Sequence, residues 1–134
     1  KIIIQYKLKE KVELKKAVFN QEKCKVLSEA SAFILPSYSE SFGIAIAEAM
    51  FFGLPIITTT KTPWSVIKSK NLGWFVNPEK QALESALQNL FKSSENNLLK
   101  KGNRAKLYIS KKYDLMETSK QMKEEIISLV KSKK

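Results

Sequence analysis

An apolar segment with a single charge limits the folds open to this 134-residue chain. Between Phe42 and Phe52 the only charged residue is Glu48, and the other side chains are apolar or small. A helix with so little polar surface is expected to be buried on most sides. Because an unpartnered buried polar group costs on the order of 2–7 kcal/mol, Glu48 must lie on an exposed line of the helix or bind a partner. Its surroundings favour a partner.

Short apolar runs alternate with helical patterns along the chain, an order typical of parallel βα units. Apolar and β-branched runs predict strands at 32–35, 55–59 and 73–76, and the first is expected to be covered on both faces. Val12–Leu14 alternates and is a candidate for another short strand. The predicted fold class is therefore α/β, with a Rossmann-like parallel sheet flanked by helices.

Helices are predicted between and after these strands. We expect one from a cap at Asn20 to Ala30, one from about 42 to Gly53 and a short one over 64–70. The buried positions of the first are expected to include Cys24, Val26 and Leu27.

The C-terminal part of the chain is predicted to be helical over about 94–130. Before it, Asn77 and Pro78 are read as the cap and first position of a helix. The apolar face of that helix is expected to hold Leu83, Leu87, Leu90 and Phe91. A further helix surrounds Gly102, and Asp114 and Glu117 form a capping box for a last helix to about Val130.

Charge and composition exclude several classes of site. The chain has no histidine and one cysteine, so it cannot by itself form a zinc site or a Cys/His or Ser/His nucleophile pair. No apolar run is long enough to span a bilayer. The net charge is +11, but Arg104 is the only arginine, whereas specific phosphate or base recognition usually recruits arginine. A solvated lysine surface is the favoured interpretation, with weak attraction to polyanions or to an anionic membrane face as the alternative.

The loop 37–41 joins the first predicted strand to the apolar helix, where open α/β sheets bind ligands. The backbone N–H groups at 42–44 are expected to point outward along the helix axis, which suits a phosphate or a sugar oxygen. Gly43 lets a ligand approach the backbone closely. Glu40 precedes the helix and Glu48 lies one to two turns inside it, so a ligand over the N-terminus can be held at both ends. Carboxylates suit vicinal diols such as a ribose or a hexose ring.

These residues resemble a known signature. Glu40 and Glu48, followed by Gly53-Leu54-Pro55, resemble the E-x7-E motif of retaining GT-B glycosyltransferases, and more narrowly the glycosyl transferases group 1, or family 4. Thr62-Pro63-Trp64 and Leu72–Val76 resemble the following turn and strand in members that build lipopolysaccharide or capsule. The resemblance extends over most of the chain. It implies that residues 1–134 are part of the C-terminal, nucleotide-sugar-binding half of a GT-B fold, itself incomplete.

The resemblance implies roles for individual positions. Glu40 would be the catalytic carboxylate that contacts hydroxyls of the donor sugar, and Glu48 would bind the ribose diol. The donor would also be bound by Ser41, Phe42, Gly43 and Ile44, whose amides at 42–44 would face the sugar and diphosphate. No metal or other cofactor is expected, because enzymes of this kind steady the leaving diphosphate with cationic side chains and helix dipoles.

The whole enzyme is thus expected to be a hexosyltransferase that moves a sugar from a nucleotide diphosphate sugar to a saccharide or lipid-linked acceptor with retention. The implied setting is bacterial lipopolysaccharide or cell-surface polysaccharide biosynthesis in the cytoplasm, with peripheral contact at the inner face of the membrane as a further expectation. The alternative is a basic nucleic-acid-binding module or a non-catalytic nucleotide-binding module. Nucleic acid is disfavoured because the lysines are dispersed and no aromatic-basic recognition motif is present.

The chain departs from the family pattern near its start. It begins at Lys1 without a methionine, which suggests a piece of something longer. The basic pair that grips the diphosphate has no counterpart before Val12, and Lys16 stands where a glycine is expected. An acceptor-binding N-terminal domain is also missing, so the chain alone is expected to be inactive. A nearby lysine such as Lys61 is a disfavoured substitute for the basic pair.

Overall fold

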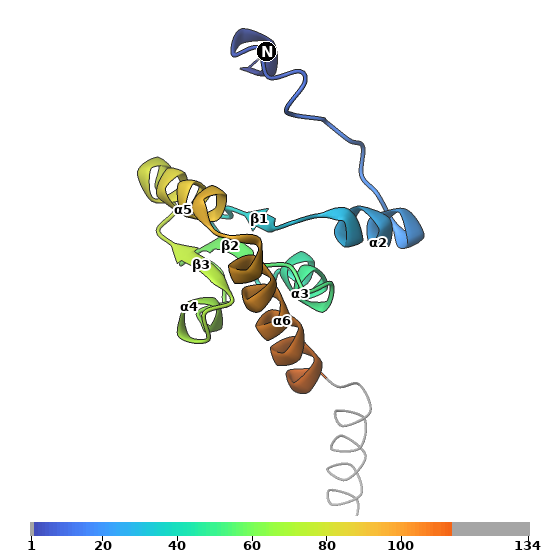
Figure 1. Ribbon diagram of the computed structural model, residues 1–134, viewed down its shortest axis with the longest axis vertical. Helices are drawn as coiled ribbons and strands as arrows, with labels where there is room; N and C mark the ends of the chain where they lie inside the picture. The colour runs from blue at the N-terminus through green and yellow to red at the C-terminus, as the bar shows by residue number, and fades with distance from the viewer. Residues whose placement is uncertain (1, 114–134) are drawn as a thin grey trace, which may run out of the picture.

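The computed structural model describes residues 2–113, in which helices and strands alternate (Figure 1). The helices are α1 (Ile2–Gln5), α2 (Asn20–Glu29), α3 (Ile44–Phe51), α4 (Val66–Ser69), α5 (Lys80–Lys92) and α6 (Glu95–Lys112). The strands are β1 (Phe33–Leu35), β2 (Ile56–Thr59) and β3 (Gly73–Val76). The helix predicted from Asp114 to about Val130 lies outside the described residues.

The three strands form one parallel sheet in the order β1-β2-β3. Ile34 pairs with Ile57, and Ile57 pairs with Trp74. The predicted α/β class with a parallel sheet is therefore confirmed. The strand at 32–35 was expected to be covered on both faces, and this is wrong, because β1 is an edge of the described sheet and Ile34 is 42% exposed. The fully covered strand is β2, whose four residues are all buried.

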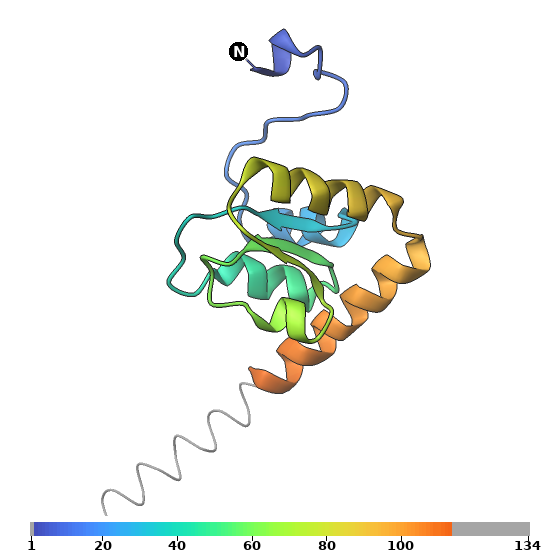
Figure 2. The ribbon, with the colours of Figure 1, turned by 90° about the vertical axis from the view of Figure 1, so that its left-hand side faces the viewer.

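Helices cover both faces of the sheet, as Figure 2 shows with α5 on one side and α3 and α4 on the other. On the α3 face, a buried cluster combines α3, α4 and α6 residues with Ile56 of β2. On the opposite face, Ile57 packs against Ala86 and Leu90 of α5. Because side chains alternate across a strand, Ile56 and Ile57 anchor the two layers from adjacent positions.

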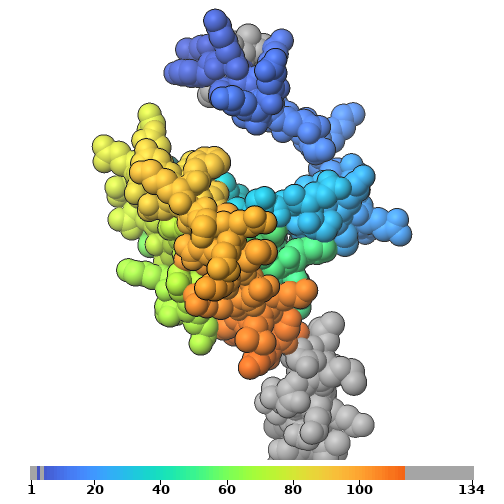
Figure 3. Space-filling view, in the orientation of Figure 1, coloured from blue at the N-terminus to red at the C-terminus, as the bar shows by residue number. Residues whose placement is uncertain are grey.

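Helix α6 packs against α3 and, in the view of Figure 3, crosses in front of it. Gly102 makes this close approach possible, since a Cβ atom there would overlap the backbone carbonyl oxygen of Gly53. Gly53 follows the last turn of α3, and its left-handed φ of 73° ends that helix. The packing of α6 thus fixes the C-terminal end of α3, whose other end carries the predicted site.

The N-terminal segment differs from its prediction. Val12–Leu14 forms no strand, and residues 12–19 have no regular structure and extend from α2 toward α1 (Figures 1 and 2). Alternation alone supplies no hydrogen-bond partner, and Leu14 is 83% exposed. The helix after it is confirmed, but Phe19 occupies the cap position and Asn20 is the first helical residue. Cys24, expected inside, is exposed.

Two expectations about α5 are also wrong. Its N-cap is Glu79, so Asn77 and Pro78 lie in the turn before the helix, where the Glu79 amide donates to the Asn77 carbonyl at 2.8 Å. Phe91 was expected on the apolar face but is 82% exposed. It follows the buried Leu90 by about 100° around the helix, which turns it away from the sheet.

Candidate functional site

The loop from Pro36 to Gly43 leaves the carboxyl end of β1 and leads into α3. Two buried threonines at the end of β2 hold its start. Thr58 Oγ1 donates to the Leu35 carbonyl at 2.8 Å, and Thr59 Oγ1 donates to the Ser37 carbonyl. Because these threonines belong to the central strand, the loop begins from a fixed backbone at the edge where ligands bind in open α/β sheets.

Glu40 lies within this loop and is half-buried. Ser37 Oγ donates to Glu40 Oε1 at 2.8 Å, which holds the carboxylate against the start of the same loop. The side chains between them, Tyr38 and Ser39, are exposed. The loop therefore presents one held carboxylate among side chains that face solvent.

The N-terminus of α3 lies directly after this carboxylate. Gly43 is its N-cap, with φ 76° and ψ 60°, and no side chain caps the helix. The Ile46 amide donates to the Gly43 carbonyl at 2.8 Å, whereas the amides of Ile44 and Ala45 have no acceptor among the described residues and remain available to an anionic or polar ligand. Ser41 and Ile44 on either side are exposed. Four of the predicted donor-binding residues, 41–44, thus form one continuous junction.

A cluster of three aromatic residues, Phe42, Trp64 and Tyr113, packs at this junction. Trp64, only 2% exposed, donates from Nε1 to the Phe42 carbonyl at 2.5 Å. The rings of Phe42 and Trp64 lie 5.2 Å apart, and Tyr113 meets the Phe42 ring edge-on at 5.6 Å. A Cβ atom on Gly43 would lie 3.4 Å from Trp64 Nε1, so the indole also limits the residue that fits at the cap. A hollow of about 310 Å³ adjoins the cluster and is lined in part by Ser41, Phe42 and Lys112.

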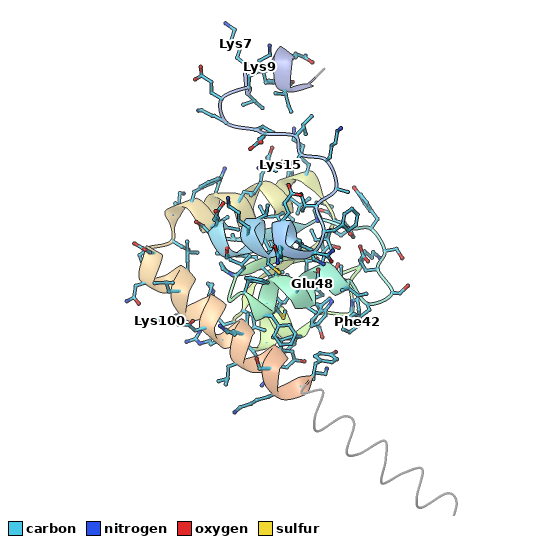
Figure 4. All side chains as sticks on the ribbon, turned by 90° about the vertical axis from the view of Figure 1, so that its right-hand side faces the viewer. Lys7, Lys9, Lys15, Phe42, Glu48 and Lys100 are labelled. Atoms are coloured by element: carbon cyan, nitrogen blue, oxygen red, sulfur yellow. The ribbon has the colours of Figure 1, made fainter. Side chains whose placement is uncertain are left out.

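Glu48 lies in the second turn of α3, where α2 crosses it (Figure 4). Its partner is Lys23 of α2, whose Nζ lies 2.5 Å from Glu48 Oε1. The Lys23 and Glu48 side chains are 38% and 33% exposed. An ion pair this exposed contributes about 0–1 kcal/mol to the free energy of unfolding. The carboxylate that looked costly in an apolar helix is therefore half-exposed and paired.

Sequence reasoning missed Lys23, although a signal for it exists. Lys23, Val26, Leu27 and Ala30 follow one another at helical spacing, and all four are at least partly buried. A lysine on the inward face of an amphipathic helix predicts a carboxylate partner on the neighbouring element. The structure brings Glu48 to that lysine, whereas Glu40 is held separately in the loop.

Cations surround a second hollow of about 580 Å³ between α4 and the end of α6. Its charged lining is entirely basic and its apolar lining is Leu72, Leu107 and Tyr108. The basic residues are Lys70, Arg104, Lys111 and Lys112. Lys112 Nζ also lies 5.6 Å from the centre of the Tyr108 ring. We call these seven residues the basic groove.

Within residues 2–113, no three or more His, Cys, Asp or Glu side chains are grouped so that they could hold a metal ion. None of the helices described in that range has the length and apolar character needed to cross a membrane.

Comparisons with solved structures address the fold. The sucrose-phosphate synthase of Thermosynechococcus elongatus is similar with a TM-score of 0.82 and 22% sequence identity, over 98% of this chain and 33% of that chain. This likeness confirms that the sheet and helices are those of part of a GT-B glycosyltransferase fold.

Sequence comparisons address the family. Sucrose-phosphate synthase 4 of Arabidopsis thaliana is 40% identical over 60 residues, which is 43% of this chain and 6% of that protein. The chain therefore spans only a small part of the curated relative and a third of the structural one. The family described as glycosyl transferases group 1 matches residues 1–108, most of the chain. The chain belongs to the glycosyl transferases group 1 family.

Proposed function

We propose that this chain forms the donor-binding part of a retaining glycosyltransferase. The observation that carries the proposal is the junction at 41–44, a helix N-terminus with no side-chain cap that follows a held carboxylate, Glu40, and precedes a second one, Glu48. Membership of the glycosyl transferases group 1 family supports a nucleotide sugar as the ligand of such a junction.

The junction and the two carboxylates each suit one part of that ligand. The open amides at the start of α3, with the positive end of the helix dipole, suit a diphosphate. Glu40 suits the hydroxyls of the transferred sugar, because a carboxylate accepts two hydrogen bonds at once. Glu48, one turn further along the helix, suits the ribose diol.

The reaction proposed for the whole enzyme is the transfer of a hexosyl group with retention. The bond between the anomeric carbon and the diphosphate oxygen breaks, and the diphosphate leaves with the bonding electrons. The acceptor hydroxyl then bonds to the same face of the sugar and gives up its proton to the departing diphosphate. The junction would contribute by stabilising the charge that develops on the leaving diphosphate, with no metal ion or other cofactor in the proposal.

The acceptor and setting are further proposals. A saccharide or lipid-linked acceptor in bacterial cell-surface polysaccharide or lipopolysaccharide biosynthesis, in the cytoplasm, is supported by the residues Thr62–Trp64 and Leu72–Val76. The two named relatives are sucrose-phosphate synthases, whose names indicate a phosphorylated sugar as product. Radiolabelled sugar transfer by the full-length enzyme to lipid-linked saccharide or to a hexose phosphate distinguishes the two acceptor classes.

A nucleotide titration tests the donor site in the 134-residue chain. UDP, GDP, ADP and their glucose conjugates are titrated into wild type, Glu48→Ala and Glu40→Ala by calorimetry. We expect Glu48→Ala to lower the affinity for every nucleotide. Glu40→Ala should remove the higher affinity for the nucleotide sugar relative to the free nucleotide. Glu84→Ala, an exposed change on α5, is the matched control and should bind as wild type does.

Two results would contradict the proposal. Equal binding by wild type and both variants would show that neither carboxylate holds the ligand. Tighter binding to a single-stranded oligonucleotide than to any nucleotide, with a steep loss on added salt, would favour the nucleic-acid alternative.

Contact with an anionic membrane is a second proposal, favoured by the basic groove. Its four cations and the 57%-exposed Leu107 form a surface that suits phosphate headgroups above an apolar layer. Binding to phosphatidylcholine vesicles with and without phosphatidylglycerol tests it. Replacing Lys70, Arg104 and Lys111 with Gln should remove binding to the anionic vesicles, whereas Gln at Lys9, Lys11 and Lys80 should reduce it less. An equal loss of vesicle binding in both triple variants would show that binding depends on net charge alone and not on the basic groove.

A further inference from the structure

We propose that Lys23 is a positioning residue that orients the Glu48 carboxylate toward the ribose diol of the donor. The inference rests on the proposed donor-binding function and extends it to a residue outside the loop and helix that form the junction. Lys23 belongs to α2, which precedes β1, and reaches Glu48 across 25 positions of sequence.

The contact is directed at one carboxylate oxygen. Lys23 Nζ lies 2.5 Å from Glu48 Oε1, and among the residues that the structure describes no hydrogen bond reaches Oε2. A carboxylate has two oxygens and about four lone-pair sites, so a bond at Oε1 leaves acceptor capacity for ligand hydroxyls. The lysine would fix the rotation of the carboxylate while a diol binds.

The surroundings of Lys23 support a directing role. Val26 and Leu27 follow it on the inward face of α2, and Leu27 packs into the core beneath α3. The lysine stem thus starts from a packed surface, and 38% of the side chain is exposed to solvent. Because the pair adds little to the free energy of unfolding, removal of Lys23 should affect ligand binding more than folding.

A direct contact between Lys23 and the diphosphate is the main competing role. The two roles differ in what the loss of the lysine should weaken. A positioning lysine matters only when the ribose hydroxyls are present, whatever the number of phosphates. A phosphate-binding lysine matters more for the diphosphate than for the nucleoside, whatever the sugar.

The test compares ligands that differ by one group. The probe is whichever of UDP, GDP and ADP binds wild type, together with its 2′-deoxy counterpart and its nucleoside. They are titrated into wild type, Lys23→Met, Lys23→Arg, Glu48→Gln and the double variant Lys23→Met/Glu48→Gln. Lys25→Met, two positions along α2 and exposed, is the matched control.

We expect wild type to prefer the ribonucleotide over the 2′-deoxynucleotide by about tenfold, the size of a hydrogen bond to a charged group. Lys23→Met should lose most of this preference and Lys23→Arg should restore it. In the Glu48→Gln background, Lys23→Met should change nothing further. Thermal denaturation of each variant should show that all are folded.

Each contrary result has a separate meaning. Failure of wild type to bind any nucleotide, or an unchanged preference in Glu48→Gln, overturns the proposed function and this inference with it. A preference lost in Glu48→Gln but kept in Lys23→Met overturns the inference alone. A loss in Lys23→Met that is larger for the diphosphate than for the nucleoside assigns the lysine to phosphate binding instead.

Discussion

The indole N–H of Trp64 donates to the carbonyl oxygen of Phe42 across 22 positions of sequence, at 2.5 Å. This bond joins the turn after β2 to the last residue before the cap of α3. Because Trp64 is almost fully buried in the core, its hydrogen bond fixes the backbone of Phe42 at the proposed donor site. The carbonyl of Phe42 is thereby held, and the backbone that follows it enters Gly43 in a left-handed conformation.

Trp64→Phe keeps an aromatic ring but removes this donor. We expect the free energy of unfolding to fall by about 1–3 kcal/mol, from the lost hydrogen bond and the smaller ring. Nucleotide affinity should also fall under conditions in which the variant remains folded. The reason is that the Phe42 carbonyl is no longer held, so the amides at the start of α3 are less well fixed. Denaturant unfolding and nucleotide titration measure the two effects. Trp74→Phe on β3 is the control, and equal loss of affinity in both variants would contradict the role of Trp64.

Gly43→Ala and Gly53→Ala form a matched pair at the two ends of α3. Both glycines have left-handed backbones, with φ of 76° and 73°, so alanine should cost about 1–2 kcal/mol at each. At Gly43 the new Cβ would also lie 3.3 Å from Ile46 Cδ1, whereas at Gly53 the nearest atom is 3.8 Å away. Urea unfolding should therefore show Gly43→Ala as the less stable variant. Nucleotide affinity should fall in Gly43→Ala alone, and an equal fall in Gly53→Ala would count against a ligand at the N-terminus.

Most of the sheet could be predicted from the sequence because its signals are local. The predicted strand at 73–76 coincides with β3, and those at 32–35 and 55–59 differ from β1 and β2 by one residue. Apolar and β-branched runs ended by proline or glycine define a buried strand without reference to the rest of the fold. The neighbours of each strand are not local, which is why Ile34 was wrongly expected to be covered.

The site could be predicted only in part for the same reason. Glu40, Glu48 and the junction 41–44 lie within one short segment, so their order along a loop and helix follows from sequence spacing. Lys23 and Trp64 reach this segment from α2 and from the turn after β2, and contacts over more than 20 positions depend on how helices cross. Whether these residues bind a donor stays a prediction until the titrations are done.

Gly102→Ala tests whether close packing outweighs helix propensity in α6. Alanine favours a helix over glycine by about 1 kcal/mol, so local propensity alone predicts stabilisation. The Cβ atom would instead overlap the backbone of Gly53, and a backbone atom cannot rotate away as a side chain can. We expect net destabilisation of about 1–3 kcal/mol or more by urea unfolding. Asn103→Ala, exposed on the next position, should be neutral or stabilising, and similar behaviour of the two variants would contradict the packing argument.

Because Lys101 is buried, we expect it to raise the free energy of unfolding as the pH becomes alkaline. Only 8% of this lysine is exposed, its Nζ donates to Asn71 Oδ1, and the ammonium lies 5.1 Å from the centre of the Trp74 ring. Burial, with repulsion from Arg104 as a smaller cause, lowers the pKa of Lys101 from its usual 10.5. Between the lowered pKa and 10.5 the unfolded chain binds more protons than the folded one, so this group makes folding more favourable as pH rises. Well below that window its contribution is constant.

The measurement compares unfolding free energies of wild type and Lys101→Met from neutral pH upward. The stability of wild type relative to the variant should increase through the alkaline window, because methionine carries no charge to neutralise. Lys100→Met, at the exposed neighbouring position, should stay parallel to wild type throughout. A constant difference between wild type and Lys101→Met across the window would show that the ammonium is as well solvated in the folded chain as in the unfolded one. The opposite slope would mean that Asn71 and Trp74 stabilise the charge more than burial penalises it.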